Sequence, residues 1–179
     1  LQDIGISHSE ISGDTRFDRV LEVKNEDASF PLIESYILKS KILVGGSTWS
    51  QDESIIFELL ERSNLDLKYI IAPHLIGNDH INEILKRFKK YNPVRYSKAN
   101  KSNIKDCKVL IIDEIGFLSK LYRYADFAYV GGGFGVGIHN LLEASTYGIP
   151  VLFGPNHKRF REAIDLQNLG GGFSISSYK

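Results

Sequence analysis

Glycine, hydroxyl and histidine residues gather directly after several apolar runs of the sequence. Gly46, Ser47 and Thr48 follow the first run, and Pro73 and His74 follow the second. Hydroxyls and backbone N–H groups placed there can hold a phosphate at a helix N-terminus. Ser47 and Thr48 can equally cap the helix that follows, and the two roles are compatible. His74 taken alone fits a surface loop residue as well as a site residue.

The densest glycine run covers residues 131–137 and leads into a segment expected to be helical from His139. Glycines such as Gly132 and Gly133 let backbone N–H groups approach an anion, and a helix N-terminus favours negative charge. The run therefore predicts a site for a phosphate or a sugar carboxylate. The dinucleotide fingerprint G-x-G-x-x-G fails here, and no Walker A motif occurs. A dinucleotide oxidoreductase is accordingly the least favoured class.

The third candidate group is His139, Asn140 and Glu143, just after the glycine run. Residues four apart share one face of a helix, so the pattern places His139 and Glu143 together with Asn140 beside them. A carboxylate there can accept hydrogen bonds from two vicinal hydroxyls of a ribose. An ordinary solvated glutamate is the alternative. Leu141 and Leu142 make the segment largely apolar, however, and a carboxylate on a mostly buried helix needs a partner.

An alternation of apolar runs and amphipathic stretches supplies the scaffold for these residues. The predicted strands cover residues 41–45, 68–72, 94–97, 109–112, 127–130, 150–153 and 173–175. The predicted helices cover residues 18–24, 31–38, 51–62, 78–91, 117–124, 139–147 and 159–169. This order predicts an α/β fold, with a Rossmann-like parallel sheet and helices on both faces. Ligands of such sheets bind at the carboxyl ends of the strands, where the candidate residues fall.

Composition narrows the possible classes of protein. The chain has 179 residues, 42% of them hydrophobic, and a formal net charge of zero, so no nucleic-acid partner is expected. No apolar run approaches the ~20 residues of a membrane helix. No cluster has the spacing of a metal site, and no catalytic triad can be argued from residue order. The chain has one cysteine and no methionine, and we take it to be a processed or excised piece of a longer protein.

A longer pattern connects these residues to a known family. The stretch from Ala128 to Asn156 reads AYVGGGFGVGIHNLLEASTYGIPVLFGPN. It resembles the bacterial 3-deoxy-D-manno-octulosonic acid (Kdo) transferases, whose pattern is two glycines, a short loop, Gly-x-His-Asn-x-x-Glu and Gly-x-Pro-Val-x-x-Gly-Pro. Further matches follow the family order at residues 12–18, 46–48 and 113–116, so the resemblance spans nearly the whole chain. One departure is His74, which stands where many members have arginine and would hold phosphate less strongly.

The resemblance implies the C-terminal, donor-binding half of a GT-B glycosyltransferase that uses CMP-Kdo. The implied donor-site residues are Gly46, Ser47, Thr48, Pro73, His74, Ile115, Gly116, Gly132, Gly133, His139, Asn140 and Glu143. Ser47 and Thr48 would hold phosphate, Ile115 and Gly116 would meet cytosine through backbone groups, and Glu143 would hold the ribose. The glycine run would face the Kdo moiety. Residues 1–40 would be a linker with two lead-in helices from a missing N-terminal domain, and residues 41–179 the nucleotide-sugar-binding domain.

The family reaction is inverting, uses no metal or cofactor, and transfers Kdo to a lipid A precursor in lipopolysaccharide biosynthesis. The acceptor and the acidic general base would belong to the missing domain, so we expect this soluble piece to be inactive alone. The full-length protein would be associated with the cytoplasmic face of the bacterial inner membrane. Two alternatives stay open: a UDP-sugar-using GT-B glycosyltransferase or epimerase, and a non-catalytic nucleotide-binding module. Preference for cytosine over uracil nucleotides separates the first, and the effect of altering Glu143 on binding separates the second.

Overall fold

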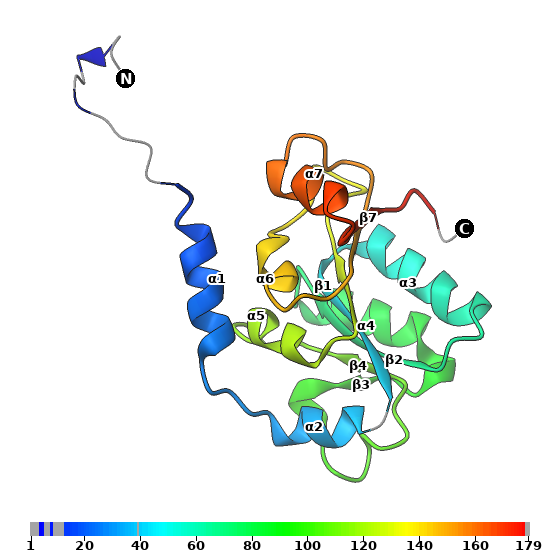
Figure 1. The fold of residues 1–179 in the computed structure, drawn as a ribbon. Helices are drawn as coiled ribbons and strands as arrows, with labels where there is room; N and C mark the ends of the chain where they lie inside the picture. The colour runs from blue at the N-terminus through cyan, green and yellow to red at the C-terminus, as the bar shows by residue number, and fades with distance from the viewer. Residues whose placement is uncertain (1–3, 6–7, 9–12, 39, 178–179) are drawn as a thin grey trace.

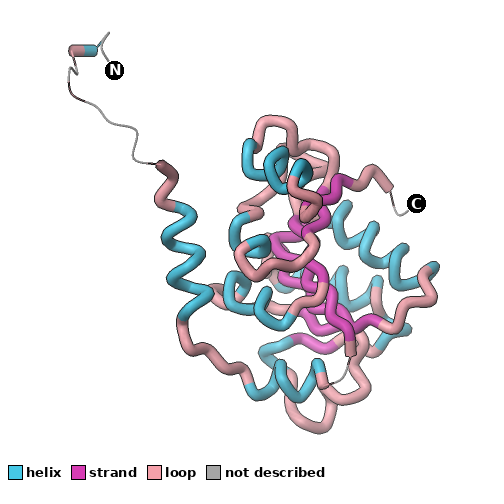
Figure 2. The backbone as a smooth tube through the Cα atoms, viewed as in Figure 1, coloured by secondary structure: helices cyan, strands magenta, loops and turns pink. Residues whose placement is uncertain are grey.

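A seven-stranded, all-parallel sheet lies at the centre of the computed structural model, which describes residues 4–5, 8, 13–38 and 40–177 (Figures 1 and 2). Its strands are β1 (Lys41–Thr48), β2 (Leu67–Pro73), β3 (Val94–Arg95), β4 (Val109–Ile111), β5 (Phe127–Val130), β6 (Val151–Phe153) and β7 (Gly172–Ser174). They are arranged in the order β3-β4-β2-β1-β5-β6-β7. Each strand predicted from the sequence is present, and the predicted fold class is confirmed.

In the described part of the chain, two α-helices precede β1, and each of the other α-helices lies between two successive strands. They are α1 (Arg16–Asn25), α2 (Pro31–Ile37), α3 (Ser50–Arg62), α4 (Asn78–Arg87), α5 (Leu118–Leu121), α6 (Leu142–Ser145) and α7 (Arg161–Asn168). Short 3-10 turns lie at Lys89–Tyr91, Tyr96–Lys98 and Tyr122–Tyr124. One helix prediction was wrong. The segment 139–147 contains only the four-residue helix α6, so His139 and Asn140 precede it.

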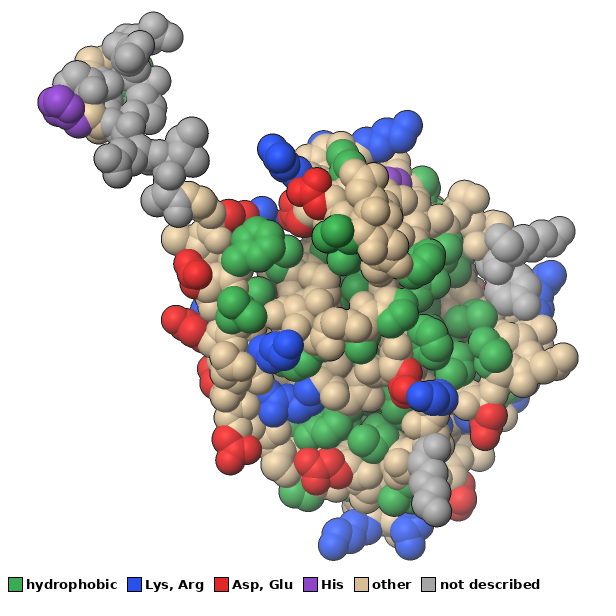
Figure 3. Space-filling model, viewed as in Figure 1, with side chains coloured by type: hydrophobic (Ala, Val, Ile, Leu, Met, Phe, Trp, Pro, Cys, Tyr) green, Lys and Arg blue, Asp and Glu red, His purple; other side chains and the backbone are tan. Residues whose placement is uncertain are grey.

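Alternation along β1 shows why the sheet is covered on both faces. Ile42 and Val44 join one buried cluster, to which α2, α5, α6 and α7 contribute. Leu43, between them, joins the cluster formed with α3 and α4. Successive side chains of a strand point to opposite faces, so an uninterrupted apolar run must be buried on both. Charged side chains of both signs are scattered among apolar ones on the outer surface seen in Figure 3.

The strand order reverses at β1, which pairs with β2 on one side and with β5 on the other. Such a switch point is where ligands bind in open α/β sheets. The backbones of β1 and β5 approach closely at their carboxyl ends, where the Gly131 N–H donates to the Gly46 carbonyl at 2.9 Å. A Cβ atom at Gly131 would lie 2.3 Å from the Ser47 carbonyl oxygen. Glycine at this position is therefore a requirement of the strand contact.

The two N-terminal helices pack differently. Ile33 and Tyr36 of α2 are fully buried, and the Tyr36 hydroxyl donates to the carbonyl oxygens of Tyr69 and Lys108 at 3.0 and 2.9 Å. The packed core thus includes residues that precede β1. α1 lies against α5 and α6 at the edge of this core (Figure 1). Residue 12, the first of the family motif at 12–18, lies outside the described residues.

Candidate functional site

The loops predicted to share one edge of the sheet do so, because every strand runs parallel and each of these loops follows a strand. The predicted residues divide into three parts of this edge. Ser47, His74 and His139 lie around the ends of β1, β2 and β5. Asn140 and Glu143 form a separate polar group at α6. The loop of Ile115 and Gly116 follows β4.

Ser47 and Thr48 end β1 in an irregular turn. The strand register shifts between Gly46 and Thr48, and Ser47 has a φ of +51°, a left-handed conformation that is uncommon for serine. Thr48 is 0% exposed, and its hydroxyl lies 3.3 Å from Glu53 Oε1. The alternative in which these residues cap the next helix is wrong, since α3 begins at Ser50 with Trp49 as its N-cap. Of the two predicted phosphate contacts, only Ser47 reaches the surface.

Asp52, in the first turn of α3, holds this edge together. It is 1% exposed, and its Oδ2 atom accepts hydrogen bonds from the backbone N–H groups of Trp49 and Gly132, both at 2.9 Å. Its Oδ1 atom accepts the Tyr129 hydroxyl at 2.6 Å. Burial, reinforced by the Asp52 charge, raises the pKa of Tyr129 above its usual value. One carboxylate therefore joins α3, β5 and the glycine run.

Glu53 is a second buried carboxylate, next to Asp52. His80 Nε2 on α4 lies 2.9 Å from Glu53 Oε1. Burial raises the pKa of Glu53, and this effect outweighs the opposing influence of His80. The His80 side chain faces this carboxylate and is only 16% exposed. Glu53 and His80 thus support Thr48 from beneath the edge.

Trp49, His74 and His139 form a cluster of rings, which we call the tryptophan–histidine cluster. The centroid of His74 lies 4.6 Å from that of Trp49 and 4.5 Å from that of His139. The rings of Trp49 and His139 are nearly parallel, with 12° between their planes, and Trp49 Nε1 donates to His139 Nε2 at 3.1 Å. Burial, with a smaller contribution from His74, lowers the pKa of His139.

His139 and Glu143 do not share a helix face, contrary to the sequence prediction. The Asn140 Oδ1 atom accepts the Leu142 N–H at 3.1 Å, and this local bond competes with a helical turn through 139–141. The His139 N–H donates instead to the Gly131 carbonyl at 3.1 Å. His139 is thereby turned toward the glycine run, and its Cδ2 atom would lie 3.0 Å from a Cβ atom placed on Gly132.

The glycine run is a turn fastened by its own backbone. The N–H groups of Gly135 and Gly137 donate to the Gly132 carbonyl at 2.9 and 3.2 Å, while Gly132 itself donates to Asp52. A Cβ atom at Gly133 would lie 2.6 Å from the Cα atom of Gly154, so the glycine there permits contact between two loops. The predicted helix N-terminus at His139 is absent. The run therefore lacks the helix-end support that its anion-binding prediction assumed.

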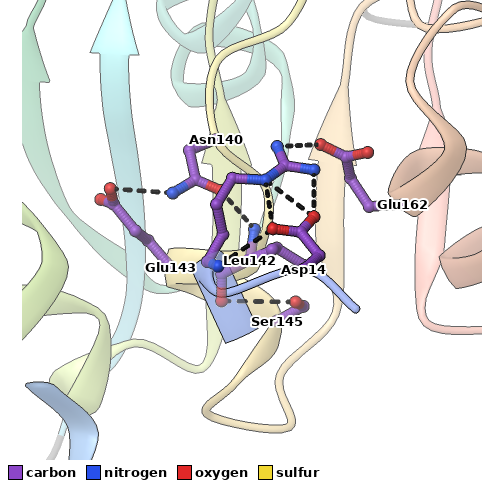
Figure 4. Close-up of polar contacts among 7 residues, drawn as sticks. Asp14, Asn140, Leu142, Glu143, Ser145 and Glu162 are labelled. Atoms are coloured by element: carbon purple, nitrogen blue, oxygen red, sulfur yellow. Dashed lines mark hydrogen bonds and ion pairs between the residues drawn. The ribbon is translucent and has the colours of Figure 1, made fainter. Parts of the chain in front are cut away.

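Asn140 and Glu143 border a cavity of about 210 Å³. Its walls come from α1, α5 and the segment around α6, and its lining residues are Arg16, Arg19, Val20, Val23, Ser119, Asn140 and Glu143. Asn140 Nδ2 donates to Glu143 Oε1 at 3.1 Å (Figure 4). Burial raises the pKa of Glu143, although the Asn140 hydrogen bond opposes it. The carboxylate at this cavity is thus half-buried and incompletely compensated, as a site for hydroxyl donors requires.

α1 contributes a charged rim to the same cavity. The Arg16 guanidinium lies 2.7 Å from Asp14 Oδ2 and 3.0 Å from Glu162 Oε1, and so ties α1 to α7 (Figure 4). Sequence reasoning placed Arg16 only within the family motif and passed over Arg19. Helical spacing of Arg16, Arg19, Val20 and Val23 was the available signal, since it puts these residues on one face.

The Ile115–Gly116 loop projects from the sheet edge. Ile115 is 85% exposed, and Gly116 has a φ of +97°, a conformation that favours glycine. Asp113 fixes its base by accepting hydrogen bonds from Arg95 Nε at 2.8 Å and the Ser97 hydroxyl at 2.6 Å. Burial alone would raise the pKa of Asp113, but these bonds lower it below its usual value.

Pro73 and His74 mark the end of β2 beside β1. Pro73 is buried and pairs with Thr48 in the sheet, and the His74 N–H donates to the Thr48 carbonyl at 2.9 Å. The His74 side chain is exposed except where it stacks on its two aromatic neighbours. Within residues 4–5, 8, 13–38 and 40–177, no three His, Cys, Asp or Glu side chains converge as metal ligands. The same described part of the chain contains no helix of the length and apolarity needed to cross a membrane.

Solved structures define the class of this fold. The C-terminal CMP-Kdo binding domain of WaaA from Acinetobacter baumannii superimposes with a TM-score of 0.69 at 19% identity, over 90% of this chain and 82% of that one. A UDP-N-acetylglucosamine 2-epimerase superimposes with a TM-score of 0.58 at 17% identity, over 92% of this chain and 38% of that one. The chain has the Rossmann-like fold of the C-terminal half of a GT-B glycosyltransferase.

Within that class, the chain is related in sequence to the Kdo transferases, and the resemblance predicted from its motifs is confirmed. The enzyme of Aquifex aeolicus is 32% identical over 145 residues, which are 78% of this chain and 39% of that protein. The enzyme of Chlamydophila psittaci is 32% identical over 119 residues, 65% of this chain and 27% of that protein. No protein-family model matches the chain. The aligned residues make up well under half the length of these two curated relatives.

Proposed function

We propose that this chain is the donor-binding domain of a Kdo transferase and binds CMP-Kdo at the carboxyl edge of its sheet. The observation that carries the proposal is the half-buried Glu143 carboxylate, held by Asn140 beside the cavity under α1. Both residues belong to the motif through which the chain resembles the Kdo transferases. The sequence relationship to those enzymes and the likeness to a CMP-Kdo binding domain support the same function.

Glu143 holds the ribose of the donor. Its Oε1 atom accepts the Asn140 amide, which leaves acceptor capacity for the two vicinal hydroxyls. Hydroxyl donors stabilise the ionised carboxylate that burial disfavours, so ligand binding lowers the pKa of Glu143. Hydrogen bonds to a charged group contribute about 1.5–3 kcal/mol each in favourable cases. This interaction explains how a small cavity can bind a polar nucleotide.

The phosphate lies near the carboxyl ends of the neighbouring strands β1 and β2, where Ser47 and His74 present polar atoms. Thr48 supports this position through Glu53 instead of touching the ligand. As the glycosidic bond breaks, negative charge develops on the leaving CMP phosphate, and fixed donors at this edge stabilise it without a metal. The exposed Ile115–Gly116 loop offers backbone groups to the cytosine, and Asp113 holds that loop in place.

The complete protein, in this proposal, transfers Kdo to a lipid A precursor with inversion during lipopolysaccharide biosynthesis. The acceptor and the general base belong to a second domain, and the enzyme works at the cytoplasmic face of the inner membrane. This chain alone then has no transferase activity. Incubating it with CMP-Kdo and a lipid A precursor, and looking for a Kdo-bearing product, tests that statement. Turnover by the chain alone would refute it.

Calorimetric titration of the chain with CMP, with UMP and NAD as controls, tests the donor assignment. We expect saturable binding of CMP in preference to both controls. Glu143→Gln should weaken it at least tenfold while the thermal transition stays cooperative. A matched control is Glu61→Gln, because Glu61 pairs with Tyr91 at the far end of α3. Preference for UMP would assign the domain to a UDP-sugar enzyme, and binding that ignores Glu143 would refute the ribose site.

A further inference from the structure

The hydrogen bond between Trp49 and His139 fixes the protonation of one ring. Indole Nε1 can only donate, so the His139 Nε2 atom, 3.1 Å away, must accept. A histidine that accepts at Nε2 is neutral and carries its proton on Nδ1. The Nδ1 atom makes no hydrogen bond to any residue that the structure describes, and it is therefore available to a ligand.

Four further contacts make this arrangement rigid. The Asp52 carboxylate accepts the backbone N–H of Trp49. It also accepts the backbone N–H of Gly132, which lies next to the His139 ring. The His74 ring lies over both partners, with centroid separations of 4.6 and 4.5 Å. A residue whose orientation is fixed before the ligand arrives loses less entropy on binding.

We propose that Trp49 is a positioning residue, which holds His139 as the neutral Nδ1–H tautomer so that it donates one directed hydrogen bond to an anionic oxygen of the bound nucleotide sugar. The ligand part of this inference rests on the proposed function. The groups that face His139 are His74 from the end of β2 and Asp52 from α3, and their charges influence it in opposite directions. Through the Trp49 bond, the site binds its anion without needing a charged imidazolium.

The ligand-free protein provides a direct test by NMR. Trp49 is the single tryptophan of the chain, so its indole N–H resonance is unambiguous. We expect ¹⁵N chemical shifts of His139 that report an unprotonated Nε2 at pH 7.5. As acid protonates His139, the indole resonance should shift toward its free position. An indole signal that stays unchanged while His139 titrates, or a proton found on Nε2, overturns the proposal.

Two variants separate positioning from packing. Trp49→Phe keeps an aromatic ring against His74 but removes the donor, so we expect His139 to exchange between tautomers and its pKa to rise. His139→Gln retains an acceptor for the indole, and it should keep the indole signal nearer its original position than His139→Ala does. Tyr91→Phe is the matched control, since it removes an aromatic donor far from this site. Identical His139 titration in wild type and Trp49→Phe contradicts the proposal.

Binding of CMP then tests the role toward the ligand. We expect Trp49→Phe to weaken CMP binding about threefold to tenfold at pH 7.5, the effect of one misdirected hydrogen bond. The loss should shrink as the pH falls through 6.5, because the released His139 becomes charged. Unchanged affinity and pH profile in this variant refute the role toward the ligand. Absence of CMP binding in the wild type refutes the proposed function, whereas the NMR results still decide how Trp49 acts on His139.

Discussion

Asp52 and Glu143 are both carboxylates in the first turn of a helix at the same edge of the sheet, yet their surroundings differ. Asp52 is surrounded by three donors, two backbone N–H groups and the Tyr129 hydroxyl. Glu143 has one polar partner in the described structure, Asn140, and opens on a cavity. Asp52 is buried, whereas Glu143 is only half-buried. The number of satisfied acceptor positions separates a carboxylate that holds the protein from one that is prepared for a ligand.

The strongest test of this contrast is Asp52→Ala. It leaves three donors without their partner, two of them buried, and removing one member of a buried charged network costs about 3–5 kcal/mol. We expect a correspondingly large fall in the free energy of unfolding, measured by urea denaturation. Asp66→Ala is the control, because that carboxylate is 93% exposed and forms a surface ion pair with Lys108. Equal unfolding midpoints for the two variants would show that Asp52 does not hold the edge together.

The turn that Asp52 fastens provides a second test with an internal control. In Gly133→Ala the new Cβ atom would meet the backbone of Gly154 at 2.6 Å, where neither loop can move aside cheaply. We expect a loss of about 1–3 kcal/mol in unfolding free energy, as for other overpacked sites. In Gly135→Ala the nearest atom lies 3.6 Å away, so stability should hardly change. Similar thermal transitions for both variants would contradict the close approach of the two loops.

We expect Glu143→Gln to weaken ligand binding without a loss of stability, whereas Asp52→Ala should chiefly lower stability. The raised pKa of Glu143 means that the folded protein binds its proton more tightly than the unfolded chain. Stability is therefore lost as the pH rises from the ordinary carboxyl value through the raised pKa. The glutamine variant lacks this loss. Its melting temperature should therefore rise relative to that of the wild type as the pH increases from 4.5 to 8. CMP affinity should meanwhile fall at least about tenfold.

Thermal scans across that pH range, paired with calorimetry, measure both quantities for Glu143→Gln. A variant that is less stable at every pH and binds CMP normally would place Glu143 among the residues that hold the protein. In that case Glu143 and Asp52 would both have a structural role. Greater stability with weaker binding would instead identify a carboxylate kept for its ligand at a cost to the fold.

The same contrast explains how far the sequence could be interpreted. Short apolar runs predicted every strand, because burial on both faces of the sheet leaves a local pattern within each segment. The carboxylate contacts of Asp52 could not be predicted, since Tyr129 and Gly132 lie 77 and 80 residues away along the chain. Glu143 was found because it stands in a motif. The helix from His139 was overpredicted, because the bond from Leu142 to the Asn140 side chain replaces the first turn.

Arg16→Gln is expected to have the smallest effect, and it tests whether the cavity at Glu143 depends on α1. The Arg16 side chain is 52% exposed in its ion pairs with Asp14 and Glu162, so the melting temperature should change by less than about 2 °C. Without its link to α7, α1 should show faster amide hydrogen exchange. CMP should also bind about twofold more weakly, because Val20 and Val23 then cover the cavity less tightly. Faster exchange with unchanged CMP affinity would mean that Glu143 holds its ligand without α1, whereas a parallel change in both would show that this helix helps to hold the ligand.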